Sequence, residues 1–251
     1  MSMPLWVQVL TVVELSFVAA LIAAWATRRT RLIFAAGFNV MIPVIGLYLW
    51  HAPALYPRAL LGTAMAALYL LRLNGVILLW TDTTAMSKLD AALPSRAKLG
   101  LAFVLAHAVG LGYCLPFYYV ASDPRPLGGQ DLLAVVVYLV GTVFHAGGDY
   151  QKRRFKQRAD SRGTLLRTGL WSLCRHPNYF GDFLIYVSFA LLARNPWAWV
   201  SPALNLLQYL FDAVPKSEQW AAEKYGEAWA AYAAATPMFV PRPRSGNHTG
   251  G

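Results

Sequence analysis

Long apolar segments separated by short polar connections dominate this sequence. Seven of these segments approach the length of about 20 apolar residues that an α-helix needs to cross a bilayer. Charged residues are rare inside them and cluster in the connections between them. The pattern predicts an all-α, polytopic integral membrane protein with about seven transmembrane helices, at residues 4–27, 32–50, 59–80, 98–121, 131–148, 179–194 and 197–214.

The composition narrows the class of protein further. Hydrophobic residues make up 57% of the 251 residues and charged residues only 14%, whereas a soluble domain has about 25% charged residues. An ordinary water-soluble globular domain and a largely disordered chain are therefore both excluded. The two cysteines, Cys114 and Cys174, lie in an apolar segment and in a basic loop, and we expect them to remain unpaired.

The distribution of Lys and Arg sets the expected orientation, because loops that face the cytoplasm carry an excess of these residues. With the N-terminus outside, the outer loops hold only Arg58, Arg125 and Arg194, and the cytoplasmic segments hold nearly all other cations. We therefore expect the N-terminus outside and the C-terminus in the cytoplasm, in a bacterial inner membrane. This topology accounts for most of the net charge of +10, so no nucleic-acid partner is expected.

The segment that follows the last apolar stretch has a different pattern. Between Lys216 and Ala235, four aromatic residues recur close to one helical face. They predict one amphipathic helix at the membrane surface. The tail at residues 242–251 is expected to be disordered. The four aromatic residues are Trp220, Tyr225, Trp229 and Tyr232.

The densest group of polar residues lies between the fifth and sixth apolar segments. Gly147 and Gly148 are expected to end the fifth helix. Several cations beside a helix N-terminus form a phosphate site. Directed hydrogen bonds to an amide or a ribose can come from Asn178, Tyr179 and Asp182. Asp182 is expected in the first turn of the sixth helix. In the alternative interpretation, the basic residues only retain this loop in the cytoplasm. The group comprises Asp149, Gln151, Lys152, Lys156, Arg175, His176, Asn178, Tyr179 and Asp182.

Three stretches of this region resemble a known membrane family. RTGLWSLCRHPNYFGD, from Arg167 to Asp182, resembles the signature of the family that contains the steroid 5-alpha-reductase C-terminal domain and its bacterial DUF1295 relatives. Sterol C14- and C7-reductases share a similar RHxNYxGD element. GDYQKRRFK, from Gly148 to Lys156, and EQWAAEKYGEAWAAYAAATPMFVP, from Glu218 to Pro241, resemble further elements of this family. The resemblance implies four N-terminal helices on the substrate side at residues 1–130 and a reductase-like membrane domain with the cofactor site at residues 131–241.

The resemblance implies one of two chemistries. Reductases of this superfamily bind NADPH, whereas its isoprenylcysteine and phospholipid methyltransferases bind S-adenosylmethionine. Asn178, Asp182 and the many cations favour the reductase, because a dinucleotide with three phosphates needs more cations than a sulfonium. We therefore expect a membrane-bound NADPH-dependent oxidoreductase that acts on a carbon–carbon double bond of a steroid-like or isoprenoid lipid. The alternatives are a methyltransferase of a lipid or prenylated acceptor and a non-catalytic lipid-binding relative.

The resemblance also implies roles for individual residues. Asp149, Lys152 and Lys156 would hold ribose and phosphates. Arg175, His176, Asn178, Tyr179 and Asp182 would hold the nicotinamide half or the adjoining ribose and diphosphate. Glu218 and Tyr225 would close the site. Tyr69 and Arg72 match a Tyr-x-x-Arg element of the steroid reductases. By this match, Tyr69 would be the proton donor and Arg72 would contact a phosphate of the cofactor.

Polar side chains inside the spans are further candidates, because they are costly in lipid. Glu14 is a second candidate acid, with a structural ion pair or interhelical hydrogen bond as the alternative. The segment at 32–50 lacks the Gln-Glu pair of steroid 5-alpha-reductases, which argues against reduction of a 3-ketosteroid. His107 and His145 alone do not make a metal site, and no metal is expected. The polar residues inside the spans are Glu14, Asn39, Arg72, Asn74, His107, His145, Asn205, Gln208 and Asp212.

Overall fold

The computed structural model describes residues 3–27, 29–80, 94–161 and 163–242, and these residues form helices and no strands. Five helices are long and apolar enough to cross a membrane: Leu5–Thr27, Thr30–His51, Pro57–Leu79, Arg96–Ser122 and Gly129–Lys156. The expected all-α membrane fold is therefore confirmed. Most of the predicted polar connection at 81–97 and nearly all of the predicted disordered tail at 242–251 lie outside the described residues.

The predicted number of seven spans is not confirmed. The sixth predicted span forms α9, Pro177–Ala193, with 17 residues, which is at the lower limit for a bilayer crossing. The seventh forms α10, Val200–Gln208, and continues through the π-helical segment η6, Tyr209–Ala213, into α11, Val214–Tyr225. Asn205, Gln208 and Asp212 make this stretch less apolar than the five longer spans.

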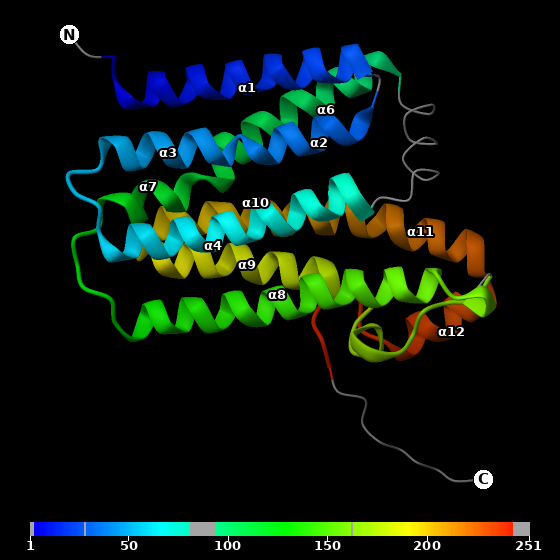
Figure 1. The fold of residues 1–251 in the computed structure, drawn as a ribbon. Coiled ribbons are helices and arrows are strands. Elements are labelled where there is room, and N and C mark those ends of the chain that lie inside the picture. The colour runs from blue at the N-terminus through cyan, green and yellow to red at the C-terminus, as the bar shows by residue number, and fades with distance from the viewer. Residues whose placement is uncertain (1–2, 28, 81–93, 162, 243–251) are drawn as a thin grey trace. The chain divides into compact units, whose positions relative to one another are not determined.

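The chain divides into two compact units, and Figure 1 shows their helices. The first unit contains Met1–Ala134 and Phe189–Leu204. In it, α1 packs against α2 and α6, and α4 packs against α7. Its elements are α1 (Leu5–Thr27), α2 (Thr30–Asn39), α3 (Met41–His51), α4 (Pro57–Asn74), η1 (Gly75–Trp80), α6 (Ser95–His107), η2 (Ala108–Tyr113), α7 (Leu115–Ser122) and η5 (Pro196–Trp199).

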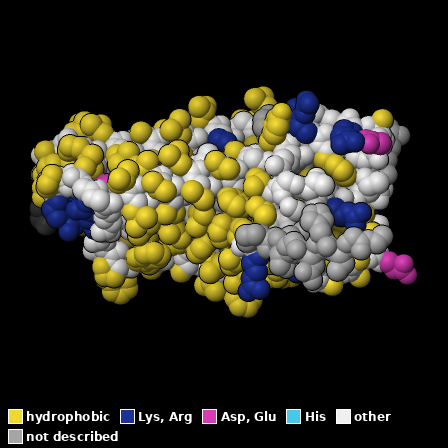
Figure 2. Space-filling view, turned by 90° about the horizontal axis from the view of Figure 1, so that it is seen from below, with side chains coloured by type: hydrophobic (Ala, Val, Ile, Leu, Met, Phe, Trp, Pro, Cys, Tyr) yellow, Lys and Arg dark blue, Asp and Glu magenta, His cyan; other side chains and the backbone are white. Residues whose placement is uncertain are grey.

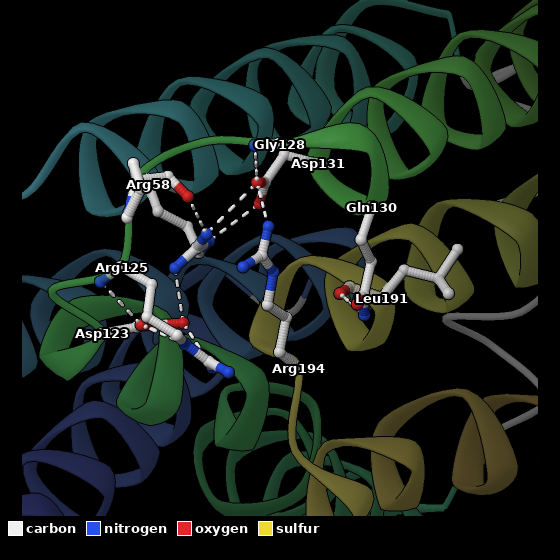
Figure 3. A network of polar contacts seen from close by, with 9 residues as sticks. Arg58, Asp123, Arg125, Gly128, Gln130, Asp131, Leu191 and Arg194 are labelled. Atoms are coloured by element: carbon white, nitrogen blue, oxygen red, sulfur yellow. Dashed lines mark hydrogen bonds and ion pairs between the residues drawn. The ribbon is translucent and has the colours of Figure 1, made fainter.

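All three cations predicted for the outer loops belong to one ion-pair network of the first unit (Figure 3). Arg58 is fully buried and donates from Nε to Asp131 Oδ1 at 2.7 Å and from Nη2 to Asp131 Oδ2 at 3.1 Å. Its Nη1 pairs with Asp123, to which Arg125 also donates two side-chain hydrogen bonds. Arg194 pairs with Asp131. The network ties the start of α4 to the segment after α7, to the first turn of α8 and to the end of α9.

The second unit contains Val135–Ser188 and Asn205–Gly251. Helix α8, Gly129–Lys156, begins in the first unit and continues into the second without a break at Gly147 or Gly148. The predicted helix end at this pair is therefore wrong. A Cβ atom on Gly148 would lie 3.1 Å from the backbone nitrogen of Asn178, so this glycine serves the close approach of two segments instead. The remaining elements are η3 (Ala159–Ser161), η4 (Gly169–Ser172) and α12 (Glu227–Ala235).

The predicted C-terminal amphipathic helix is two helices. Helix α11 ends at Tyr225 and α12 begins at Glu227, with Gly226 between them at a φ of 52°. Residues with a side chain rarely adopt this backbone conformation, whereas glycine does so readily. Gly226 therefore turns the chain at the point where a single helix was expected.

Hydrophobic side chains remain exposed along the long helices. On α8, the exposed residues include Val136, Leu139, Val140 and Val143, and Figure 2 shows hydrophobic side chains over much of the visible face. A water-soluble monomer rarely exposes apolar patches of this extent. Together with the five long apolar helices, this surface identifies the chain as an integral membrane protein.

Candidate functional site

The candidate site lies in the second unit, where Glu218 of α11 meets the two residues that precede α9. Arg175 donates to Glu218 from Nε at 2.8 Å and from Nη2 at 3.0 Å. His176 is buried and bonds to the same carboxylate from Nε2 at 2.9 Å. Arg175 also donates to the carbonyl oxygen of Ala233 at 2.7 Å, just before α12 ends. One carboxylate thus orients a cation and an imidazole side by side.

Burial and hydrogen bonding act in opposite directions on Glu218. Burial raises the pKa of this carboxyl group, but the hydrogen bond from His176 and the positive charge of Arg175 outweigh it. The pKa of Glu218 is therefore below its ordinary value. At neutral pH the group is a carboxylate, which is the form that can accept hydrogen bonds from both partners.

Three parallel rings extend from this contact into the second unit. The imidazole of His176 stacks on Tyr179 with ring centroids 5.2 Å apart and an interplanar angle of 1°. Tyr179 stacks in turn on Tyr209, with centroids 4.5 Å apart. The hydrogen bond to Glu218 alone would let the imidazole ring of His176 rotate about that bond. Stacking on Tyr179 holds the plane of the ring.

The far end of the ring stack is bonded to a buried carboxylate. Tyr209 donates its hydroxyl to Asp182 at 2.7 Å, and Asn205 donates to the same oxygen at 2.9 Å. His145 of α8 lies 3.5 Å from the other oxygen of Asp182. Only 4% of Asp182 is exposed. It is the sixth residue of α9, so it lies beyond the first turn in which it was expected, and its hydrogen bonds go to residues of other helices and not to the N-terminus of its own.

A second polar pair links α8 to the start of α9. Asn178 donates from Nδ2 to Asp149 Oδ1 at 3.0 Å. The Oδ1 atom of Asn178 is buried and has no hydrogen-bond partner in the described part of the chain. An unsatisfied buried acceptor is costly, and it is the feature expected where a bound molecule would supply the missing donor.

The remaining candidates of the second unit lie around these contacts. Lys152 lies over the ring of Trp171 at 5.1 Å, and Trp171 donates to the carbonyl oxygen of Gly148 at 3.1 Å. Lys156 is exposed at the end of α8. Tyr225 contacts Trp220 and lies 5.0 Å from the Lys224 ammonium. The structure therefore joins Arg175, His176, Tyr179 and Glu218 by direct contacts. Tyr209 links Tyr179 to Asp182, and Asn178 bonds to Asp149.

The other predicted residues belong to the first unit. Tyr69 is 2% exposed and packs edge-to-face on Phe189, and Arg72 is half-buried in the last turn of α4. The carboxyl group of Glu14 and Nε2 of His107 form a hydrogen bond of 3.2 Å. This bond joins α1 to α6, as in the alternative interpretation of Glu14. The side chain of Glu14 is 56% exposed.

Sequence reasoning did not assign Tyr209 to the site. Asn205 and Tyr209 are four residues apart, so they lie on one face of a helix. This spacing was the available signal, because Asn205 already stood out as a polar residue inside a span. Both residues bond to Asp182, which lies on another helix. The sequence alone does not show that these three side chains meet.

Comparisons with known proteins identify relatives of this chain. A family model described as "Protein of unknown function (DUF1295)" matches residues 21–236. A Delta(14)-sterol reductase from Mus musculus is 25% identical over 184 residues, which are 64% of this chain and 42% of that protein. A Delta(14)-sterol reductase from Arabidopsis thaliana is 32% identical over 117 residues, 42% of this chain and 31% of that protein.

A bacterial relative shows the same likeness. A Delta(14)-sterol reductase from Methylotuvimicrobium alcaliphilum is 28% identical over 151 residues, 52% of this chain and 34% of that protein. The chain thus matches between about a third and two fifths of the length of these curated relatives. It is similar to these sterol reductases over 42–64% of its own length.

Proposed function

The chain belongs to the DUF1295 family, and we propose that it is a membrane-bound, NADPH-dependent reductase of a carbon–carbon double bond in a sterol-like or isoprenoid lipid. The similarity to proteins named Delta(14)-sterol reductase supports a reductase of lipophilic substrates. NADPH, when bound, supplies the hydride that such a reduction requires.

The observation that carries this proposal is the unsatisfied acceptor of Asn178. Its Oδ1 is buried without a partner, while its Nδ2 is held by Asp149. A carboxamide or a ribose hydroxyl has the donor that this oxygen lacks. Both groups occur in NADPH.

The charges around this acceptor fit a dinucleotide. Arg175 and His176 supply a cation and an imidazole held by Glu218, and Lys152 and Lys156 lie one and two helical turns beyond Asp149. Cations of this kind bind phosphate groups in proteins. We propose that Lys152 and Lys156 hold phosphates, and that Arg175, His176, Asn178, Tyr179 and Asp182 hold or support the nicotinamide half with its ribose and diphosphate. Glu218 and Tyr225 would close this site.

The proton that completes the reduction has two candidate donors. Tyr69 and Glu14 remain our candidates, and Arg72 remains a candidate phosphate contact, on the basis of sequence alone. A Tyr hydroxyl or a carboxylic acid can each deliver a proton to carbon after hydride transfer. The Glu14 carboxyl group already bonds to His107, and this imidazole would return the proton that Glu14 gives up.

The proposed orientation places the N-terminus outside and the C-terminus in the cytoplasm of a bacterial inner membrane. It is supported by the Lys and Arg distribution. In this orientation the cluster around Arg175 and Lys156 faces the cytoplasm, where NADPH is made.

The test is ligand binding to the purified protein in detergent, followed by thermal unfolding. NADPH, NADH and S-adenosylmethionine are titrated separately. A ligand at about 100 times its dissociation constant adds about 2.7 kcal/mol of stability. We expect stabilisation by NADPH. Stabilisation by S-adenosylmethionine alone would make the protein a methyltransferase, and no response to any ligand would favour a non-catalytic lipid-binding protein.

Two variants test the residues. Asn178→Ala should abolish stabilisation by NADPH, whereas Gln208→Ala, an exposed amide on α10, should leave it unchanged. Lys156→Glu should weaken NADPH far more than NADH if Lys156 contacts the 2′-phosphate. An equal loss for both ligands would move that phosphate elsewhere.

A further inference from the structure

The first unit contains an apolar cavity that uses none of the residues of the candidate cofactor site. Its volume is about 480 Å³, within the range of about 300–1,000 Å³ that is usual for small-molecule sites. One wall is the beginning of α1, with Leu5, Trp6, Val9 and Leu10. No lining residue carries a charge.

The opposite wall carries two tyrosines. Tyr48 of α3 and Tyr118 of α7 line the cavity together with Leu111 of η2. Their rings meet edge-to-face with centroids 5.6 Å apart. Leu111 lies in a π-helical segment, and such segments occur frequently at functional sites.

The hydroxyl of Tyr48 is the feature that points to a ligand. Tyr48 is 8% exposed and its ring contacts that of Tyr118. Its hydroxyl makes no hydrogen bond with the residues that the structure describes. A buried tyrosine usually finds a hydrogen-bond partner for its hydroxyl. A group bound in the cavity would supply that partner.

The depth of the cavity identifies the kind of ligand. Leu5 and Trp6 are the first residues of α1, and Tyr48 lies one turn before the end of α3. Beside these residues, His51 bonds to Gln8 at 3.0 Å in an exposed polar pair. The cavity therefore lies near the ends of these membrane-spanning helices, the level at which Trp and Tyr are enriched.

These features together select an uncharged, hydroxylated lipid. The apolar walls exclude a phosphate group, which would lose its hydration without a cation to replace it. A hydroxyl group both donates and accepts, so it can satisfy Tyr48 and Tyr118 at once, whereas an ester carbonyl only accepts. Trp6, Leu10 and Leu111 are exposed at the rim, and in a membrane protein this rim faces lipid.

We propose that this cavity is a binding site for an uncharged lipid alcohol, whose hydroxyl bonds to Tyr48 and whose apolar body lies against the beginning of α1. The site is separate in its residues from the reduction proposed above. It gives the protein a second place to hold a lipid.

The test is photolabelling of the purified protein in phosphatidylcholine nanodiscs. The probe is a sterol alcohol that carries a diazirine and an alkyne, and the labelled peptides are identified by mass spectrometry. We expect labelling of the peptides that contain Leu5–Leu10 and Tyr48. Tyr48→Phe should lower it about fivefold, the contribution of one hydrogen bond. Leu10→Trp, which fills the rim, should lower it about tenfold.

Matched controls make the result specific. Leu60→Trp places a tryptophan at an exposed position of α4. Tyr119→Phe removes a hydroxyl from the residue next to Tyr118. Neither Leu60 nor Tyr119 lines the cavity. Both controls should label as the native protein does. Asn178→Ala should also leave this labelling unchanged, so failure of the NADPH proposal is distinguishable from failure of this one.

Two outcomes would overturn the proposal. Equal labelling of the native protein, Tyr48→Phe and Leu10→Trp would show that the probe does not enter the cavity. Equal labelling by a diazirine-bearing phosphatidylcholine, or by the methyl ether of the sterol probe, would show that the cavity accepts acyl chains without recognising a hydroxyl.

Discussion

Glu218 and His176, 42 residues apart in the sequence, are joined by a hydrogen bond of 2.9 Å. The same carboxylate pairs with Arg175. Because both partners immediately precede α9, one side chain of α11 sets the position of the segment that begins this helix. The bond therefore couples the C-terminal helices to the proposed cofactor site.

Glu218→Gln should weaken NADPH binding about tenfold, because it keeps the size of the side chain but removes the charge that orients Arg175 and His176. Binding is measured by thermal shift in detergent. Glu223→Gln is the matched control, because Glu223 is exposed on the same helix and bonds to Gln219. Unchanged affinity in Glu218→Gln would remove Glu218 from the site.

Asp182→Ala should reduce the free energy of unfolding by about 2–4 kcal/mol, because it leaves the buried donors of Asn205 and Tyr209 without their acceptor. Tyr209→Phe keeps the ring stack and removes one of these donors, so it should cost less, about 1 kcal/mol. Chemical denaturation in detergent measures both. A larger loss in Tyr209→Phe than in Asp182→Ala would contradict the hydrogen-bond arrangement.

Gly181→Ala should destabilise the second unit by at least about 2 kcal/mol. A Cβ atom at this position would lie 2.2 Å from the backbone nitrogen of His145 and 2.5 Å from the carbonyl oxygen of Gly141. The clash involves backbone atoms of α8, which cannot move aside as a side chain can. Gly100→Ala, with open space around it, should leave stability unchanged or raise it slightly, and thermal unfolding compares the two variants.

Asp123 makes stability depend on pH in the acidic range. Hydrogen bonds from Arg125 and the charge of Arg58 hold the pKa of Asp123 at about 2, below its ordinary value of about 4. The stabilisation is complete above that ordinary value and is lost as the pH falls from about 4 toward about 2. The difference in unfolding temperature between the native protein and Asp123→Asn should therefore shrink over this window. A constant difference would show that Asp123 titrates normally.

The sequence was a good guide wherever a single segment determined the structure. The apolar stretches predicted the helices, because a span is recognised from its own residues. Helix α9 begins at Pro177, a residue type suited to the first helical turn because its missing N–H group is not needed there. Both cysteines are free, as expected.

The sequence was a poor guide where the determining contact lies far along the chain. Gly147 and Gly148 were expected to end α8, because a glycine pair weakens a helix. The close approach of Gly148 to Asn178, which explains its lack of a side chain, joins residues of two different helices. Tyr209 was missed for the same reason, since its role depends on Asp182.

The ion-pair network in Figure 3 has a consequence for how the chain is made. Arg58 is synthesised before both of its acidic partners, Asp123 and Asp131, which lie 65 and 73 residues downstream. Until those residues leave the ribosome, the guanidinium has no carboxylate to meet, and its burial is costly. The buried position of Arg58 in the folded protein therefore depends on two carboxylates that are synthesised after it, so the first three long helical segments cannot complete this network by themselves.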